Sequence, residues 1–192
     1  RMLFDLLSEA FDYVITLSDH GELLGERDEW EHLCGIQPEV TNVPLCVSGP
    51  DVPEDERTEL VSLLDVHQTM LDLMGLEGPS RGEHLLSDVD RSVALTEFHG
   101  LSDLHRRSLP PDIDERIEYM NVDRDGIALP PWYYGYETVT DEFAERGECP
   151  VEDPQLELNA ARGGLTPRQS ERERYDEMSE DVMNRLEELG YA

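Results

Sequence analysis

The stretch DYVITLSDHGELLGERDEWEH, residues 12–32, decides how the first part of this chain is expected to fold. It opens with a short run of β-branched and aromatic residues at 13–17 and then turns polar. A brief apolar run that ends in a polar, glycine-containing turn favours a buried strand over a helix. In an open α/β sheet, groups just past the carboxyl end of a strand project into the crevice where ligands bind.

Asp19 and His20 stand directly after this predicted strand. They supply one hard oxygen and one imidazole nitrogen, which together can bind a divalent cation. Gly21 lets the backbone turn sharply beside them. Taken alone, the pair is equally compatible with a polar loop whose side chains cap the turn.

The rest of the chain predicts an α/β fold without internal repeats. Apolar residues at helical spacing precede the first strand, and the strongest helical period ends at Gly75. His67 lies on the apolar face of that helix, where a core histidine is expected. The aromatic run at 132–136 is expected to pack in a core rather than to line a substrate wall. The predicted elements are helices at 3–11, 59–74 and 168–189, and strands at 13–17, 43–48 and 91–98.

The charge of the chain is strongly negative. Asp and Glu number 45 against 15 basic residues, all of them Arg, giving a net charge of −30. The acidic residues are spread along the chain, which indicates adaptation to a salty cytoplasm rather than an acidic tail, a nucleic-acid mimic or a cation-storage protein. Nucleic-acid binding is disfavoured because it needs clustered basic residues. No apolar run approaches the ~20 residues of a membrane span.

Two further features concern the cysteines and the N-terminus. The three cysteines, Cys34, Cys46 and Cys149, have no paired spacing, so free buried thiols are expected. The sequence begins inside an amphipathic helix without an initiator Met, which favours the C-terminal part of a longer protein. The compartment stays open, with the cytoplasm favoured by the acidic composition.

An ordered series of motifs resembles the sulfatases of the alkaline phosphatase superfamily. It comprises ITLSDHGELLGERDEW followed by His32, then VPLCVSGP at 43–50, VSLLDVHQTMLDLMGL at 61–76 and, more weakly, RLEELGYA at 185–192. The resemblance implies the C-terminal part of an alkaline-phosphatase-like mixed sheet with flanking helices. It further implies a catalytic-domain part at 1–98 and a smaller subdomain at 99–192 that ends in a helix.

The resemblance also implies roles for particular residues. Asp19 and His20 would bind the catalytic divalent cation, with Ca²⁺ expected first and Mg²⁺ or Mn²⁺ as alternatives. His32, where family members have a Lys or a His, would contact the sulfate or phosphate group and act in catalysis. Glu22 and Arg27, in the same loop, are expected to be ordinary solvated charges.

The family's nucleophile motif, Cys-x-Pro-x-Arg, matches none of the three cysteines, and nothing before Asp12 supplies the family's N-terminal acidic metal ligands. The resemblance therefore implies half of a metal site, weak cation binding and little turnover by this chain alone. The expected parent activity is metal-dependent hydrolysis of sulfate esters. The alternatives are a phosphate or phosphonate ester hydrolase or phosphotransferase of the same superfamily, and an inactive acidic fragment with a structural or binding role.

Overall fold

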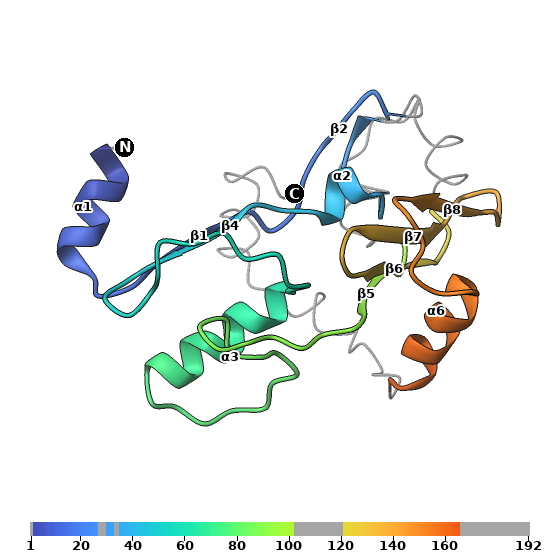
Figure 1. The fold of residues 1–192 in the computed structure, drawn as a ribbon. Helices are drawn as coiled ribbons and strands as arrows, with labels where there is room; N and C mark the ends of the chain where they lie inside the picture. Colours follow the sequence, from blue (N-terminus) through green and yellow to red (C-terminus); the bar gives the residue numbers. More distant parts are fainter. Residues whose placement is uncertain (1, 27–29, 33–34, 102–120, 166–192) are drawn as a thin grey trace, which may run out of the picture.

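The computed structural model describes residues 2–26, 30–32, 35–101 and 121–165 (Figure 1). Helices and short strands are interspersed through the first half, and a run of strands followed by a helix makes up the second, which confirms the α/β prediction. The elements are α1 (Met2–Ala10), β1 (Val14–Leu17), β2 (Leu23–Leu24), β3 (Trp30–Glu31), α2 (Pro38–Thr41), β4 (Leu45–Ser48), α3 (Leu63–Leu73), β5 (Ala94–Phe98), β6 (Arg124–Leu129), β7 (Tyr133–Glu137), β8 (Phe143–Arg146) and α6 (Pro154–Gly163).

The first predicted strand pairs with the second to form a two-stranded antiparallel ribbon. Val14 of β1 lies opposite Ser48 of β4, and Leu17 lies opposite Leu45. Pro44 directly precedes β4, as expected for a residue that cannot donate to the ladder. The prediction that β1 is buried was wrong, because two neighbouring strands alone cannot cover both faces of the ribbon and Leu17 is 39% exposed. Figure 1 shows α1 beyond the far end of this ribbon.

The main sheet is a four-stranded antiparallel meander in the order β5-β6-β7-β8. Helix α6 packs on it, and the core between them contains Ile127, Leu129, Tyr133 and Leu158 (Figure 1). Of these strands only β5 was expected, because Gly126, Gly135 and a Pro-Pro pair interrupt the apolar pattern of the others. The domain boundary expected after residue 98 stays a proposal.

A second buried cluster connects this sheet to the segment around α2. Ile36 packs with Tyr134 and Tyr136 of β7, and the Tyr134 hydroxyl donates to the Ile36 carbonyl at 2.5 Å. Burial raises the pKa of the Tyr134 phenol, so the hydroxyl remains a neutral donor. The aromatic run therefore packs in a core, as predicted, apart from the exposed Trp132.

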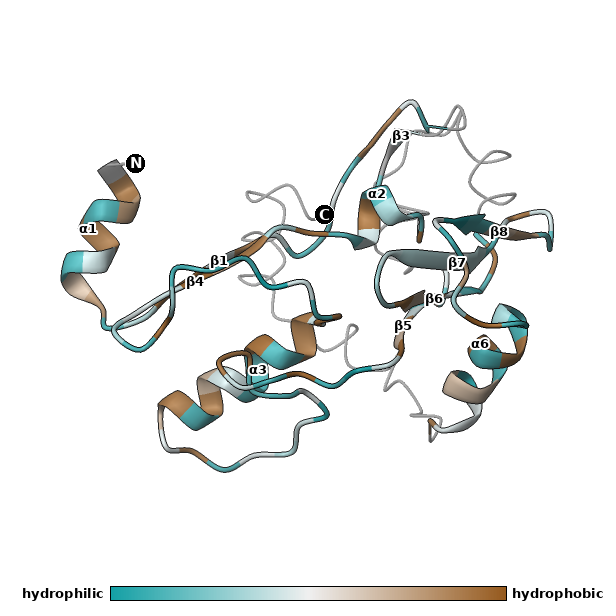
Figure 2. Cartoon of the chain, viewed as in Figure 1, coloured by the Kyte–Doolittle hydropathy of each residue, from teal (hydrophilic) through white to brown (hydrophobic). Residues whose placement is uncertain are grey.

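Helix α3 is shorter than expected and turns a different face inward. Ser62 caps it by accepting from the Leu64 amide, and Gly75 ends it with a φ of 64°. The prediction of a core histidine was wrong, since His67 is exposed. Alternating apolar and polar bands run along the helix (Figure 2), but the fully buried side chains are those of Asp65 and Thr69, at 0% exposure.

The polar stripe of α3 is buried because residues 80–91 return along it. Arg91 donates to both carboxylate oxygens of Asp65, at 2.5 and 2.7 Å. The Glu83 and Ser62 amides also donate to that carboxylate, at 2.8 and 2.7 Å. Burial by itself would raise the pKa of Asp65, but the hydrogen bonds from Arg91 and from the two amides together hold it below its usual value.

The last part of the chain and the cysteines differ in part from what the sequence predicted. Helix α6, which Asp153 caps and Pro154 begins, was not among the predicted helices. The helix expected at 168–189 lies outside the described residues, as does Cys34. Cys46 is exposed and Cys149 is partly buried, and both are free thiols, so burial was wrongly expected for Cys46.

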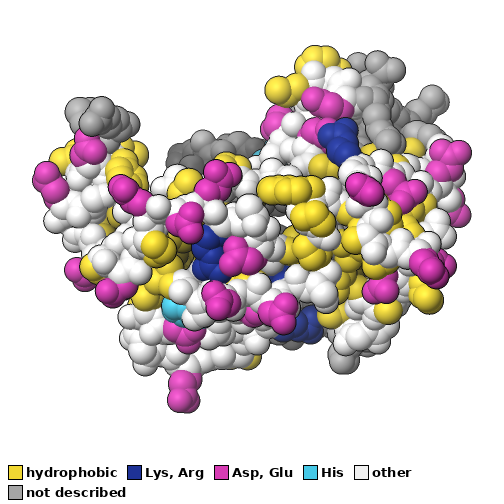
Figure 3. Space-filling model, viewed as in Figure 1, with side chains coloured by type: hydrophobic (Ala, Val, Ile, Leu, Met, Phe, Trp, Pro, Cys, Tyr) yellow, Lys and Arg dark blue, Asp and Glu magenta, His cyan; other side chains and the backbone are white. Residues whose placement is uncertain are grey.

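The surface carries the acidic residues without gathering them in one place. Figure 3 shows Asp and Glu side chains spread over the visible face with few arginines among them. Among the described residues, no helix is long and apolar enough to cross a bilayer.

Candidate functional site

A short hairpin brings together the polar residues that follow β1. Strands β2 and β3 pair antiparallel, with Leu24 opposite Trp30 and Leu23 opposite Glu31. Continuing the same register by one position sets Glu22 opposite His32. Directly opposite residues on an antiparallel pair have neighbouring side chains, so the pairing explains why two residues ten positions apart meet.

Three side chains form a cluster at the open end of this hairpin. The imidazoles of His20 and His32 stack, with ring centroids 3.9 Å apart and planes inclined by 23°. The Nδ1 atom of His32 lies 3.2 Å from a carboxylate oxygen of Glu22. The cluster is half open to solvent, since the side chains of His32 and Glu22 are 39% and 46% exposed.

The backbone around the cluster is held by hydrogen bonds to the neighbouring segment. The Gly21 amide donates to the Val40 carbonyl at 2.7 Å, and Leu23, next to the cluster, is buried. A Cβ atom at position 21 would lie 1.9 Å from the Glu39 carbonyl oxygen, so only glycine fits there. The cluster is therefore fixed to α2, which the Tyr134 hydrogen bond ties in turn to the main sheet.

Asp19 lies beside His20 and is more exposed than the three side chains of the cluster. Its carboxylate accepts from the His20 amide at 3.0 Å, and the same oxygen lies 3.7 Å from Nε2 of His20. The Asp19 side chain is 76% exposed. The two residues predicted as metal ligands are thus within reach of a shared cation, and the predicted catalytic residue, His32, is stacked on one of them.

The donors in this region fit a divalent cation. One possible ligand atom from each of His20, Glu22 and His32 lies within 4.8 Å of the others. Ligand atoms around a tetrahedral ion are about 3.3–3.6 Å apart for bonds of ~2.0–2.2 Å, so the larger separations in this group would have to shorten for all three atoms to reach one ion. The carboxylate supplies a hard donor and the imidazoles supply nitrogen donors.

Glu22 makes a contact that the sequence interpretation did not predict. It was expected to be a solvated charge, and its side chain is 46% exposed, but its carboxylate also contacts His32. The signal that points to it is its spacing: Glu22 follows His20 by two residues, which puts both side chains on the same side of an extended segment. The hairpin register, which brings Glu22 to His32, was not evident from a loop rich in charges.

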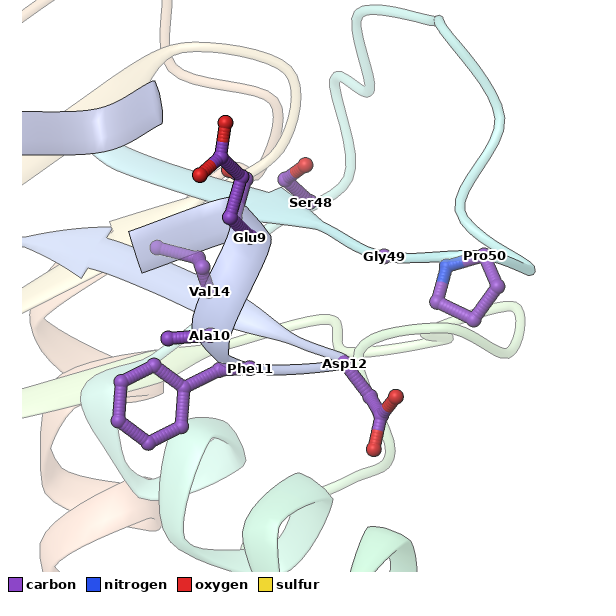
Figure 4. Close-up of a pocket in the computed structure, with 9 residues that line it drawn as sticks. Glu9, Ala10, Phe11, Asp12, Val14, Ser48, Gly49 and Pro50 are labelled. Atoms are coloured by element: carbon purple, nitrogen blue, oxygen red, sulfur yellow. The ribbon is translucent and has the colours of Figure 1, made fainter. Parts of the chain in front are cut away.

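A separate hollow lies between the end of α1 and the start of the β1–β4 ribbon (Figure 4). It encloses about 410 Å³, and its wall contains Glu9, Phe11, Asp12 and Ser48. None of the residues of the His20 cluster lines it. The hollow is therefore not part of the candidate site.

The comparisons with known proteins point to one family. Arylsulfatase K of Gallus gallus is 30% identical to this chain over 156 residues, which are 72% of the chain and 28% of the relative. A sulfatase of Formosa agariphila is 24% identical over 143 residues, or 72% of the chain and 25% of the relative. A choline-sulfatase of Rhizobium meliloti is 36% identical over 76 residues. These relatives are all sulfatases.

The fold comparison agrees. A putative sulfatase from Bacteroides thetaiotaomicron superposes with a TM-score of 0.54 at 17% identity, covering 79% of this chain and 34% of that structure. This likeness bears out the alkaline-phosphatase-like fold class, although every strand pairing among the described residues is antiparallel. No protein-family model matches the chain. The chain spans about a quarter of the length of the Gallus gallus and Formosa agariphila sulfatases, and the sequence similarity supports the sulfatase family.

Proposed function

We propose that this chain contributes part of the active site of a metal-dependent hydrolase that cleaves sulfate esters. The observation that carries the proposal is that His32 stacks on His20, with ring centroids 3.9 Å apart, while Oδ1 of Asp19 lies 3.7 Å from Nε2 of the same His20. Similarity to sulfatases over 72% of the chain supports the reaction class.

The proposed metal ligands are Asp19 and His20. Their facing atoms, Oδ1 and Nε2, are 3.7 Å apart, a separation that one divalent cation can bridge with a small rotation. When bound, the cation would act as a Lewis acid that polarises an oxygen of the ester. Ca²⁺ is the first expectation for a site completed by carboxylates, with Mg²⁺ and Mn²⁺ as alternatives.

His32 is proposed to bind an oxygen of the anionic ester and to stabilise the charge that develops there. The Glu22 carboxylate, 3.2 Å from Nδ1, orients the ring when that nitrogen carries a proton. The other ring nitrogen, Nε2, is then available to the substrate or to the leaving oxygen. Stacking on His20 keeps the imidazole close to the proposed cation ligand.

Phosphoryl esters are the second candidate substrate class. A histidine at position 32, in place of the lysine more usual in the family, favours this alternative, because an imidazole can donate a proton as well as bind an anion. A non-enzymatic role as an acidic binding domain is the remaining alternative. It predicts neither esterase activity nor any effect of His32 on such activity.

The test is hydrolysis of a matched pair of chromogenic aryl esters, one sulfate and one phosphate, by the longest product of the gene that encodes this chain. The proposal expects faster turnover of the sulfate and loss of that turnover on chelation. Faster turnover of the phosphate would move the assignment to phosphoryl chemistry. Turnover of neither ester would favour the non-enzymatic role.

A further inference from the structure

We propose that a polar pocket beside α2 is a binding site for a small oxyanion, with the Arg124 guanidinium as its charged donor. The pocket, called the Arg124 pocket below, encloses about 140 Å³ between Gln37, Arg124, Tyr136 and the turn that joins β7 to β8. Neither the proposed metal ligands nor the proposed catalytic histidine lines it. The inference therefore goes beyond the proposed function, because it concerns a second anion site that needs no cation.

The pairing of the main sheet places Arg124 at this pocket. Arg124 lies opposite Phe98 of β5, and its guanidinium carbon is 5.0 Å from the centre of that ring. Phe98 packs against the buried cluster of Ile36, Tyr134 and Tyr136, so this face of the sheet is the one that the segment around α2 covers. A cationic side chain thus lines the pocket from a sheet face that is rich in aromatic side chains.

The charge of Arg124 is buried. The residue is 3% exposed, and its Nε donates to the Val122 carbonyl at 3.3 Å. Burying a cation is costly unless acceptors or negative charge surround it. An anion in the adjoining pocket would meet the guanidinium where water screens the attraction less than at the surface. The planar guanidinium can also bind two oxygens of one anion at the same time.

Neutral donors form other parts of the pocket wall. Continuing the β6–β7 register by two positions sets Thr138 opposite Arg124, and the turn that follows brings the Thr140 hydroxyl to 3.0 Å from that of Thr138. Gln37 lines the pocket from the α2 side and is 4% exposed, and its carbonyl accepts from two amides of α2. Hydroxyl and side-chain amide groups can donate to anion oxygens, so the wall suits an oxyanion.

One carboxylate borders the pocket and opposes anion binding. Glu142 lies next to Thr138 across the turn, and its amide donates to the Thr138 hydroxyl at 3.2 Å. Because the residue is exposed, solvent weakens the repulsion that its charge exerts on a bound anion. The pocket is smaller than the ~300–1,000 Å³ typical of pockets for drug-sized ligands. It therefore suits a small anion or the anionic end of a larger molecule.

The test is an NMR titration of the isotope-labelled 192-residue chain, freed of divalent cations, with sodium sulfate or sodium acetate. NaCl holds the ionic strength constant. The amide signals of 136–142 should shift and saturate as for one site per chain. Tighter binding of sulfate would assign the pocket to a tetrahedral oxyanion, and tighter binding of acetate to a carboxylate group. Shifts that do not saturate, or that leave the signals of 136–142 unchanged, would overturn the inference.

Glu142→Gln is the most informative variant, because it removes the carboxylate that borders the pocket. It should raise the affinity for the anion about 2–5-fold, a gain that loss of fold cannot produce. Glu148→Gln is the matched control: it removes one exposed carboxylate that does not line the pocket, and it should leave the affinity unchanged. Equal affinity of the two variants would show that the net charge, not the pocket, governs binding, and would overturn the inference.

Arg124→Gln should weaken binding about 10–100-fold, because it removes the charged donor. Arg124→Lys, which keeps the charge but not the planar donor group, should restore part of the affinity. Wild-type affinity in Arg124→Gln would contradict the inference. If His32→Ala abolished binding and Arg124→Gln did not, the anion would belong to the proposed active site instead.

Discussion

At the scale of single residues, Asp65 and Gly21 each fix one contact of the first half of the described structure. Asp65 is fully buried and binds Arg91 through both carboxylate oxygens. Gly21 sits against the Glu39 carbonyl with no room for a Cβ atom. Each makes a contact for which its own residue type is required.

Replacing Asp65 with Ala should lower the free energy of unfolding by about 3 kcal/mol, because it leaves the Arg91 guanidinium buried without its main partner. The Glu83 carboxylate, 3.3 Å from Arg91, softens the loss. Asp72→Asn is the matched control on an exposed position of the same helix and should change stability by about 0.5 kcal/mol or less. Urea unfolding of wild type, Asp65→Ala and Asp72→Asn measures the two changes in stability. Equal stability of Asp65→Ala and wild type would contradict the role given to Asp65.

The lowered pKa of Asp65 also predicts a pH dependence. Since the folded-state pKa lies below the unfolded value of about 3.9, the stabilisation is fully present above that pH and is lost as pH falls through the folded-state pKa. Stability should therefore drop on acidification less steeply in Asp65→Asn than in wild type. Unfolding curves at a series of acidic pH values test this, and parallel slopes for the two proteins would show that Asp65 titrates normally.

Gly21→Ala should destabilise the chain by about 1–3 kcal/mol, because the added methyl group overlaps the Glu39 carbonyl and must push the His20 segment away from α2. The affinity of the proposed Asp19–His20 pair for a divalent cation should fall with it. Gly163→Ala is the matched control: nothing lies within 4 Å of the added atom, so that change should stabilise α6 by about 0.4–1 kcal/mol. Chemical denaturation measures the loss of stability and calorimetry measures cation binding, and an unchanged cation affinity in Gly21→Ala would contradict the proposed link between Gly21 and the metal ligands.

At the scale of elements, the sequence predicts where helices and strands form better than it predicts which of their residues are buried. The apolar runs identify α1, β1, β4 and β5, and the 3.6-residue period identifies α3. The period does not reveal which face of α3 is covered, because the returning segment at 80–91 binds the polar stripe through Arg91. The β2–β3 hairpin escapes detection for a similar reason: its strands are two residues long, and register, not composition, brings Glu22 to His32.

The link between α2 and the main sheet gives a prediction at this scale. Tyr134→Phe removes the hydroxyl that donates to the Ile36 carbonyl and leaves that carbonyl buried and unpaired. The expected loss of stability is about 1–3 kcal/mol. Tyr13→Phe, which loses only an exposed contact with Asp51, should have a much smaller effect. Hydrogen exchange of the 35–42 amides should accelerate in the first variant alone; unchanged exchange would mean that other contacts hold α2.

At the scale of the whole molecule, the net charge of −30 dominates. Repulsion among carboxylates spread over the surface opposes folding, and salt reduces it as the Debye length falls from about 30 Å at 0.01 M to about 3 Å at 1 M. The Tm should therefore rise with NaCl concentration. Scanning calorimetry over that range tests the prediction, and a Tm that stays constant or falls would argue against surface repulsion as the main electrostatic term.

The central claim is that the residues after β1 hold the metal and the ester of a sulfatase-like hydrolase. The most direct measurement is aryl sulfate hydrolysis by the longest gene product, compared among wild type, His20→Ala and His67→Ala, after chelation and after return of the cation. The account predicts recovery of turnover on metal return in wild type and His67→Ala, and a loss of about 10²-fold or more in His20→Ala. Wild-type turnover in His20→Ala, or turnover indifferent to chelation, would contradict it.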